Sequence, residues 1–156
     1  MSRSTLFTRI STAVAAFALV AGLSACGGGG DPVIPPVTTP PQVTTTLPTF
    51  TFNSVPPGVV VFTDVSINGT GTLTLTADWT FSSSDIDVYV TSTACGATTT
   101  NNLQSGCTAI GRTTATATKP ERLNVSVSPG NYRLWIANFG PSTESGTLQA
   151  SATVTR

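Results

Sequence analysis

The sequence predicts an all-β protein, in which an antiparallel β-sandwich of about eight strands follows an export signal and a Pro/Thr-rich tether. Three observations predict the sandwich. Apolar and polar residues alternate with a period of two from about residue 49 to the C-terminus. Clusters of Pro, Gly, Asn and Ser separate the alternating runs, as turns do between short strands. Only 9% of the residues are charged, and Thr, Ser, Gly and Val dominate, which is typical of extracytoplasmic β-structure.

Residues 1–25 are predicted to be a signal peptide. Arg3 and Arg9 give the start a positive charge, and residues 10–23 are uncharged and mostly apolar. This apolar run of about 14 residues is shorter than the ~20 that a membrane-spanning helix needs. A positive start, a short apolar run and small residues at its end are the marks of a secretory signal.

The next residues, Leu23-Ser24-Ala25-Cys26, resemble the lipobox of bacterial lipoproteins. The resemblance implies cleavage before Cys26, diacylglycerol on its thiol and acylation, for example with palmitate, of its new amino group. Each buried CH₂ of such chains contributes about 0.8 kcal/mol to membrane binding. The residue after the cysteine, Gly27, is not Asp, and this resembles the pattern of lipoproteins that are sent to the outer membrane. The alternative is an ordinary signal peptide cut near Ala25.

Residues 26–48 are predicted to be a linker that separates the lipidated cysteine from the folded domain. From Asp31 onward the linker is rich in proline, which favours extended polyproline II geometry. At about 3.1 Å per residue, this semi-rigid spacer could span on the order of 50 Å. Its Thr-Pro clusters also suit O-linked sugars. The prolines are Pro32, Pro35, Pro36, Pro40, Pro41 and Pro48.

Residues 49–156 are predicted to form the β-sandwich domain. The clearest strand is 71–81, which places Leu73, Leu75, Ala77, Trp79 and Phe81 on one face and mostly threonines on the other. The same alternation continues through the later segments, and no segment after the signal has a helical period. The expected strands are 49–54, 58–67, 71–81, 85–93, 107–118, 121–128, 131–139 and 145–155.

Three of these strands resemble the bacterial pre-peptidase C-terminal domain. The similar stretches are Gly71–Thr76, Asp85–Val90 and Pro129–Ile136, and the resemblance covers roughly residues 65–155. It implies a jelly-roll sandwich with an accessory role. Two departures from the family pattern are that no peptidase precedes these residues and that a cysteine pair lies within them. The resemblance therefore carries no enzymatic activity to this chain.

Cys95 and Cys107 are predicted to form a disulfide, because an even pair of thiols in an oxidising compartment is usually oxidised. The bond would close the polar segment 96–106 and stabilise the fold by about 3 kcal/mol. The alternative is a reactive or metal-binding pair. The chain has no histidine to complete a metal site, and eleven residues separate the two cysteines, so we favour the disulfide.

We predict that the protein is not an enzyme and uses no cofactor. Without histidine, no Ser-His or Cys-His nucleophile can form. Asp85 and Asp87 share one face of a strand, and such a pair could act as acid and base or hold Ca²⁺. Calcium needs roughly six oxygen ligands or more, and the neighbouring residues offer few. We therefore expect no metal, and carboxylates that protect the strand from edge pairing.

Two function classes follow from these residues. The first is a lipid-anchored envelope protein that displays a non-catalytic sandwich for structural purposes or for binding another envelope protein. The second is a module that binds a glycan or another extended ligand through aromatic rings, since Tyr89 and Trp135, joined by Phe62, alternate outward. Without Arg3 and Arg9, five basic residues face seven acidic ones. A net charge near −2 makes nucleic acid an unsuitable partner.

Overall fold

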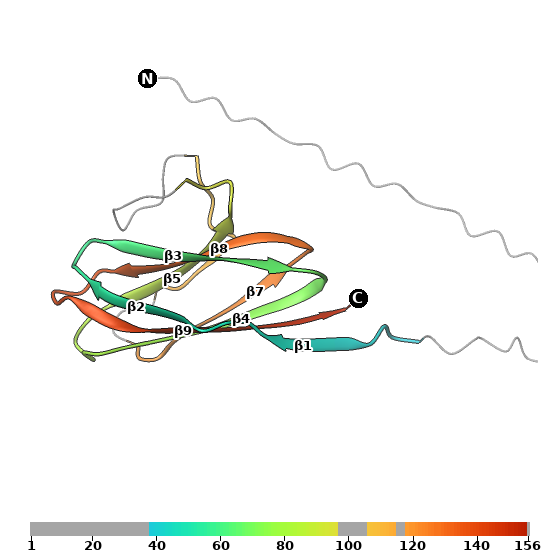
Figure 1. Cartoon of the computed structure of the whole chain (residues 1–156), viewed down its shortest axis with the longest axis horizontal. Helices are drawn as coiled ribbons and strands as arrows, with labels where there is room; N and C mark the ends of the chain where they lie inside the picture. The colour runs from blue at the N-terminus through green and yellow to red at the C-terminus, as the bar shows by residue number, and fades with distance from the viewer. Residues whose placement is uncertain (1–37, 97–105, 115–117, 156) are drawn as a thin grey trace, which may run out of the picture. The chain divides into compact units, whose positions relative to one another are not determined.

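Residues 38–96, 106–114 and 118–155 are described by the computed structural model and form two antiparallel sheets packed as a sandwich (Figure 1). The signal peptide, Cys26 and most of the predicted linker lie outside the described residues. The all-β prediction is confirmed for this part of the chain, where every regular element is a strand.

The first sheet is built around β9, the longest strand. On one side β9 pairs with β1 and β2 in succession, and on the other it pairs with β4, which pairs in turn with β7. The strands of this sheet are β1 (Gln42–Thr46), β2 (Phe50–Val55), β4 (Thr70–Trp79), β7 (Glu121–Val127) and β9 (Glu144–Thr155).

The second sheet has the strand order β3-β8-β5-β6. Its strands are β3 (Val60–Ile67), β5 (Ile86–Ser92), β6 (Gly111–Arg112) and β8 (Gly130–Asn138). From β2 onward, consecutive strands change sheet at every step except between β5 and β6. This alternation, with β1 and β2 acting as one edge, is the jelly-roll arrangement of eight strands. The predicted jelly-roll-like antiparallel sandwich is therefore confirmed.

The core lies between the inner faces of the two sheets. In β4 the alternation is as predicted, since Leu73, Leu75, Ala77 and Trp79 are buried against residues of the other sheet. The prediction for Phe81 is wrong, because its side chain is 50% exposed. The strand ends at Trp79 and the chain then turns, with the Ser84 amide donating to the Phe81 carbonyl, so the period of two no longer applies.

The predicted linker extends too far, because its residues Gln42–Thr46 form strand β1. They pair with the second half of β9, from Gln42 opposite Thr155 to Thr46 opposite Ser151. Strand β2 covers only the first half of β9, and β1 satisfies the backbone groups that would otherwise remain unpaired. Prolines at positions 41 and 48 bracket β1, where a missing amide hydrogen removes no ladder bond.

The predicted strand 107–118 is also too long. Only Gly111–Arg112 is a strand, although the pairing with β5 continues through two further bonds, from the Ile110 amide to the Val90 carbonyl and from the Thr113 amide to the Val88 carbonyl. The chain before it is tied to the disulfide rather than to a neighbouring strand. Residues 115–117 lie outside the described residues.

Candidate functional site

The predicted ligand-binding residues lie together on the outer face of the second sheet. Tyr89 on β5 is directly opposite Trp135 on β8, and both rings point away from the main core, as the alternation predicts. They belong to a second, smaller buried cluster. Its members are Val60, Tyr89, Cys95, Trp135 and Ala137, with Phe62 and Cys107 packed against them.

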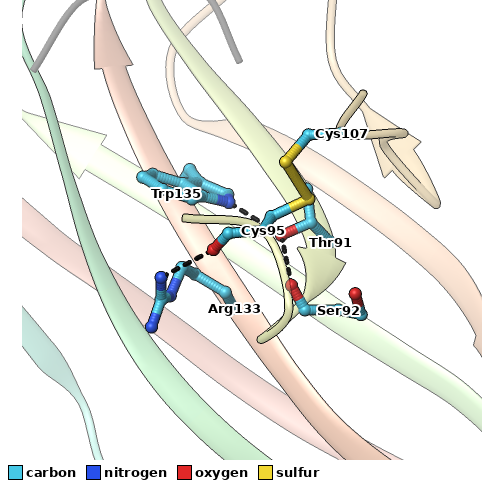
Figure 2. The surroundings of a disulfide bond; sticks show 6 residues. All are labelled: Thr91, Ser92, Cys95, Cys107, Arg133 and Trp135. Atoms are coloured by element: carbon cyan, nitrogen blue, oxygen red, sulfur yellow. Dashed lines mark hydrogen bonds between the residues drawn. A yellow bond between two sulfur atoms is a disulfide. The ribbon is translucent and has the colours of Figure 1, made fainter. Parts of the chain in front are cut away.

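The Cys95–Cys107 disulfide packs against these rings. Cys95, just after β5, is bonded to Cys107 with a Cα–Cα distance of 5.4 Å, and Figure 2 shows this disulfide beside Trp135. The predicted disulfide is thus present. Trp135 has no exposed surface, and its indole Nε1 donates a 3.0 Å hydrogen bond to the Thr91 hydroxyl. Cys95 therefore helps to turn an outer face of the sandwich into a second core.

Tyr89 and Trp135 face outward from the main core as predicted, but they do not form an exposed patch. Tyr89 is only 8% exposed and Trp135 is completely buried. Alternation specifies which face of the sheet a ring occupies, but it cannot specify whether a distant segment covers that face. In this structure the aromatic rings outside the main core are packing residues.

Arg133 forms the rim of the second cluster. Its guanidinium makes two hydrogen bonds to the Asp64 carboxylate, at 2.7 and 2.8 Å, and donates a third, of 2.8 Å, to the Cys95 carbonyl oxygen (Figure 2). The same guanidinium carbon lies 4.0 Å from the centre of the Phe62 ring. The hydrogen bond from Arg133 lowers the pKa of Asp64. Arg133 thus connects β3, β8 and the start of the disulfide loop.

The two candidate carboxylates at the start of β5 lie in a partly buried environment. The Tyr89 hydroxyl donates a 3.2 Å hydrogen bond to Asp87 Oδ2. Burial and the nearby Asp85 charge raise the pKa of Asp87, and burial together with Asp87 raises the pKa of Tyr89. Among the described residues, no group of three or more Cys, Asp or Glu side chains is arranged to hold a metal ion.

The sequence analysis did not predict the buried polar residues, and among those described Asn138, Glu144 and Glu121 make contacts that bear on the fold. Asn138 donates to the carbonyls of Val55 and Ser142, at 2.9 and 2.8 Å, and accepts from the Gly140 amide. Together these bonds hold the β2–β3 and β8–β9 connections in place. Alternation could have predicted that Asn138 is buried, because this residue is in phase with the buried residues of β8.

Glu144 and Glu121 are the two buried carboxylates. Glu144 Oε2 accepts hydrogen bonds from the amides of Thr80 and Phe81, at 3.0 and 3.2 Å, which fixes the turn after β4. Glu121 is 3% exposed, and its Oε2 has no hydrogen-bond partner among the described residues. Burial raises the pKa of Glu121, with a smaller contribution from Asp87. Both glutamates are in phase with the core positions of their strands.

The outer face of the first sheet has a different character. It carries hydroxyl and amide side chains in rows that cross β1, β9, β4 and β7, with Thr44, Thr153, Thr72 and Ser126 in one row and Thr46, Ser151, Thr74 and Asn124 in the next. All of these side chains are exposed or half-buried. No segment of the described chain packs on them as Cys95 and Cys107 pack in the cluster around Trp135. This face therefore presents polar side chains to solvent.

No protein-family model matches the chain, and no curated protein matches it. Within residues 38–96, 106–114 and 118–155, no helix is long and apolar enough to cross a membrane.

Proposed function

We propose that this protein is a lipid-anchored protein of the bacterial cell envelope, held in the outer membrane, which displays a non-catalytic β-sandwich for structural purposes or for binding a partner. The observation that carries the proposal is the run Leu23-Ser24-Ala25-Cys26 directly after an apolar segment. Small residues before the cysteine fit lipoprotein processing, and the acyl chains would supply the membrane affinity.

Two features of the folded domain support this proposal. The Cys95–Cys107 disulfide suits a protein that folds in an oxidising compartment, because cytosolic thiols are kept reduced. Only 9% of the residues are charged and the formal net charge is +0, which suits neither nucleic acid nor an anionic surface.

The non-catalytic part of the proposal is supported by the chemistry of the described residues. Most of the perturbed acids have a structural partner: Asp64 binds Arg133, and Asp87 accepts from Tyr89. The chain contains no histidine to act as a base near neutral pH. Both carboxylates are engaged in contacts within the second sheet.

The test is the substitution Cys26→Ser in cells labelled with palmitate. We expect the variant to lose the label and to leave the outer-membrane fraction, because serine cannot receive the thioether-linked lipid. Ser24→Ala is the matched control, since it keeps a small residue before the cysteine and should be labelled normally. Palmitate labelling of the Cys26→Ser protein at the wild-type level would contradict the proposal.

A further inference from the structure

The outer face of the first sheet contains a shallow trough lined mainly by polar side chains. A hollow of about 230 Å³ lies over β1, β4 and β9. We call it the threonine trough, and its lining residues are Thr46, Thr74, Thr76, Gln149, Ala150 and Ser151. A second hollow, of about 250 Å³, lies further along β4 and β9, lined by Asp78, Trp79, Thr80, Gly146 and Thr147.

The strand register places the polar side chains of the threonine trough side by side. On β4 and β9, Thr74 is opposite Ser151 and Thr76 is opposite Gln149, while Thr46 on β1 is opposite Ser151 from the other side. Neighbouring strands are about 5 Å apart, and every second residue of a strand recurs after about 7 Å. The two hollows together follow β4 for about 20 Å, from Thr74 to Thr80.

The polar side chains of the threonine trough have no hydrogen-bond partner in the part of the chain that the structure describes. Within the described part of the chain, the side chains of Thr46, Thr74, Thr76, Gln149 and Ser151 make no hydrogen bond to another residue. Elsewhere on the same face, hydroxyls do find partners, as Thr44 and Thr153 do with each other at 2.9 Å. Hydroxyl and amide groups both donate and accept, so the trough offers free groups of both kinds.

Gly146, one of the residues that line the second hollow, is in phase with the inward-facing Glu144 and Leu148 of β9. A Cβ atom at Gly146 would overlap the carbonyl oxygen of Asp78, so only glycine lets β9 approach β4 this closely. The two hollows lie one after the other along β4 and β9, so an extended chain could continue from one into the other.

The charges around the trough exclude most classes of ligand. Asp78 is paired with Lys119 at 3.5 Å, and Lys119 also donates to the Thr80 carbonyl. Arg122, opposite Thr76 on β7, is the remaining charged neighbour in the described rows. One cation is too little for a polyanion, and the lining has no exposed apolar ring for a lipid or an apolar peptide. An uncharged polymer that carries many hydroxyl groups matches the uncharged hydrogen-bond donors and acceptors of the trough.

We propose that the threonine trough binds an uncharged polysaccharide, laid along β4 and β9. This inference rests on the proposed display function and specifies the class of partner. Recognition would use the hydroxyls of Thr46, Thr74, Thr76 and Ser151 and the amide of Gln149, without aromatic stacking. Each hydrogen bond contributes only about 1 kcal/mol, so affinity depends on several bonds along the chain.

The test measures binding of the full lipidated protein, in detergent micelles, to soluble polysaccharides by affinity electrophoresis. The uncharged probes are dextran, glucomannan and xyloglucan, and the acidic probe is polygalacturonate. The variant is Thr74→Val with Thr76→Val, which keeps the side-chain shape and removes two hydroxyls. The control is Thr114→Val, an exposed threonine that follows β6 in the other sheet.

We expect at least one uncharged polysaccharide to retard the wild-type protein and the Thr114→Val control equally. Loss of two hydrogen bonds of about 1 kcal/mol each should weaken that binding about thirtyfold in the double variant, with an unchanged melting temperature. The inference is overturned if no uncharged probe binds, if polygalacturonate binds more tightly, or if the double variant binds like the wild type. Binding is measured on purified protein, so its failure is separate from a failure of palmitate labelling.

Discussion

The outer faces of the two sheets are built from the same alternating strands, yet they differ in what lies over them. On the second sheet, Trp135 and Tyr89 are enclosed by a disulfide-linked segment and by Arg133. On the first sheet, threonines such as Thr74 meet solvent. A side chain that alternates outward is therefore part of a core on one face and part of an open surface on the other. The two faces should respond differently to substitution.

The largest expected difference concerns Trp135 and Thr74. Trp135→Ala should lower the free energy of unfolding by about 3–5 kcal/mol, because it leaves a cavity beneath the disulfide and removes the partner of Thr91. Thr74→Val, on the open face, should change it by less than about 0.5 kcal/mol. Urea unfolding of both variants measures the contrast. If Trp135→Ala proves too unstable to purify, Trp135→Phe gives a smaller loss in the same direction. Equal small effects at both positions would mean that the two faces do not differ.

The second prediction concerns the disulfide that covers the aromatic face. Replacing Cys95 and Cys107 together with alanine should lower the free energy of unfolding by about 3 kcal/mol, because a closed loop of this length restricts the unfolded chain. The domain should still fold, since the main core does not include the bond. Thermal unfolding with and without reductant measures the effect on the wild-type protein. An unchanged melting temperature after complete reduction would contradict it.

The third prediction concerns Glu121, which lies at the inner side of β7 near Asp87. Its pKa is raised above the usual 4.5, mainly by burial, so the folded protein holds this proton more tightly than the unfolded chain does. The resulting stabilisation is complete below about pH 4.5 and is lost as the pH rises through the folded pKa. Glu121→Gln should therefore stabilise the protein at neutral pH, by about 1–3 kcal/mol, and change little in acid.

Asp64 provides the control of opposite sign for that experiment. Its pKa is lowered by Arg133, so its contribution is present above the usual 3.8 and is lost as the pH falls through the folded pKa. Asp64→Asn should accordingly destabilise the protein at neutral pH and not in strong acid. Unfolding curves collected between pH 3 and pH 8 separate the two substitutions. If the free energy of unfolding depended on pH in the same way for Glu121→Gln and the wild type, the pKa of Glu121 would be the same in the folded and unfolded protein, which would contradict the prediction.

The alternation of the sequence was sufficient to predict the fold class, the positions of most strands and the inner face of each one. Leu73, Tyr132 and Leu148 are buried where the period of two places them. The same rule, applied strictly, would have predicted buried positions for Glu121 and Glu144, which are in phase with apolar neighbours. Because glutamate is hydrophilic, these two positions were not assigned to the inner face, although their place in the alternation indicated it.

Other features depend on contacts between distant segments, which local pattern does not encode. Strand β1 exists because half of β9 would otherwise be an uncovered edge, although its Thr-rich sequence between prolines is typical of a linker. Trp135 is buried because Cys95, which is bonded to Cys107, packs against it. The threonine trough depends on the register of three strands far apart in the chain. Alternation could predict that these threonines face outward, but not that they line one hollow.

The most direct test of the difference between the two faces is the accessibility of the Trp135 indole. In a Trp79→Phe variant, Trp135 is the sole tryptophan, and its fluorescence can be quenched by iodide before and after reduction of the disulfide. The structure predicts almost no quenching in the oxidised protein and increased quenching after reduction, when Cys95 and Cys107 are no longer joined over the ring. Strong quenching of the oxidised, folded protein would place the indole on an open surface and contradict the account.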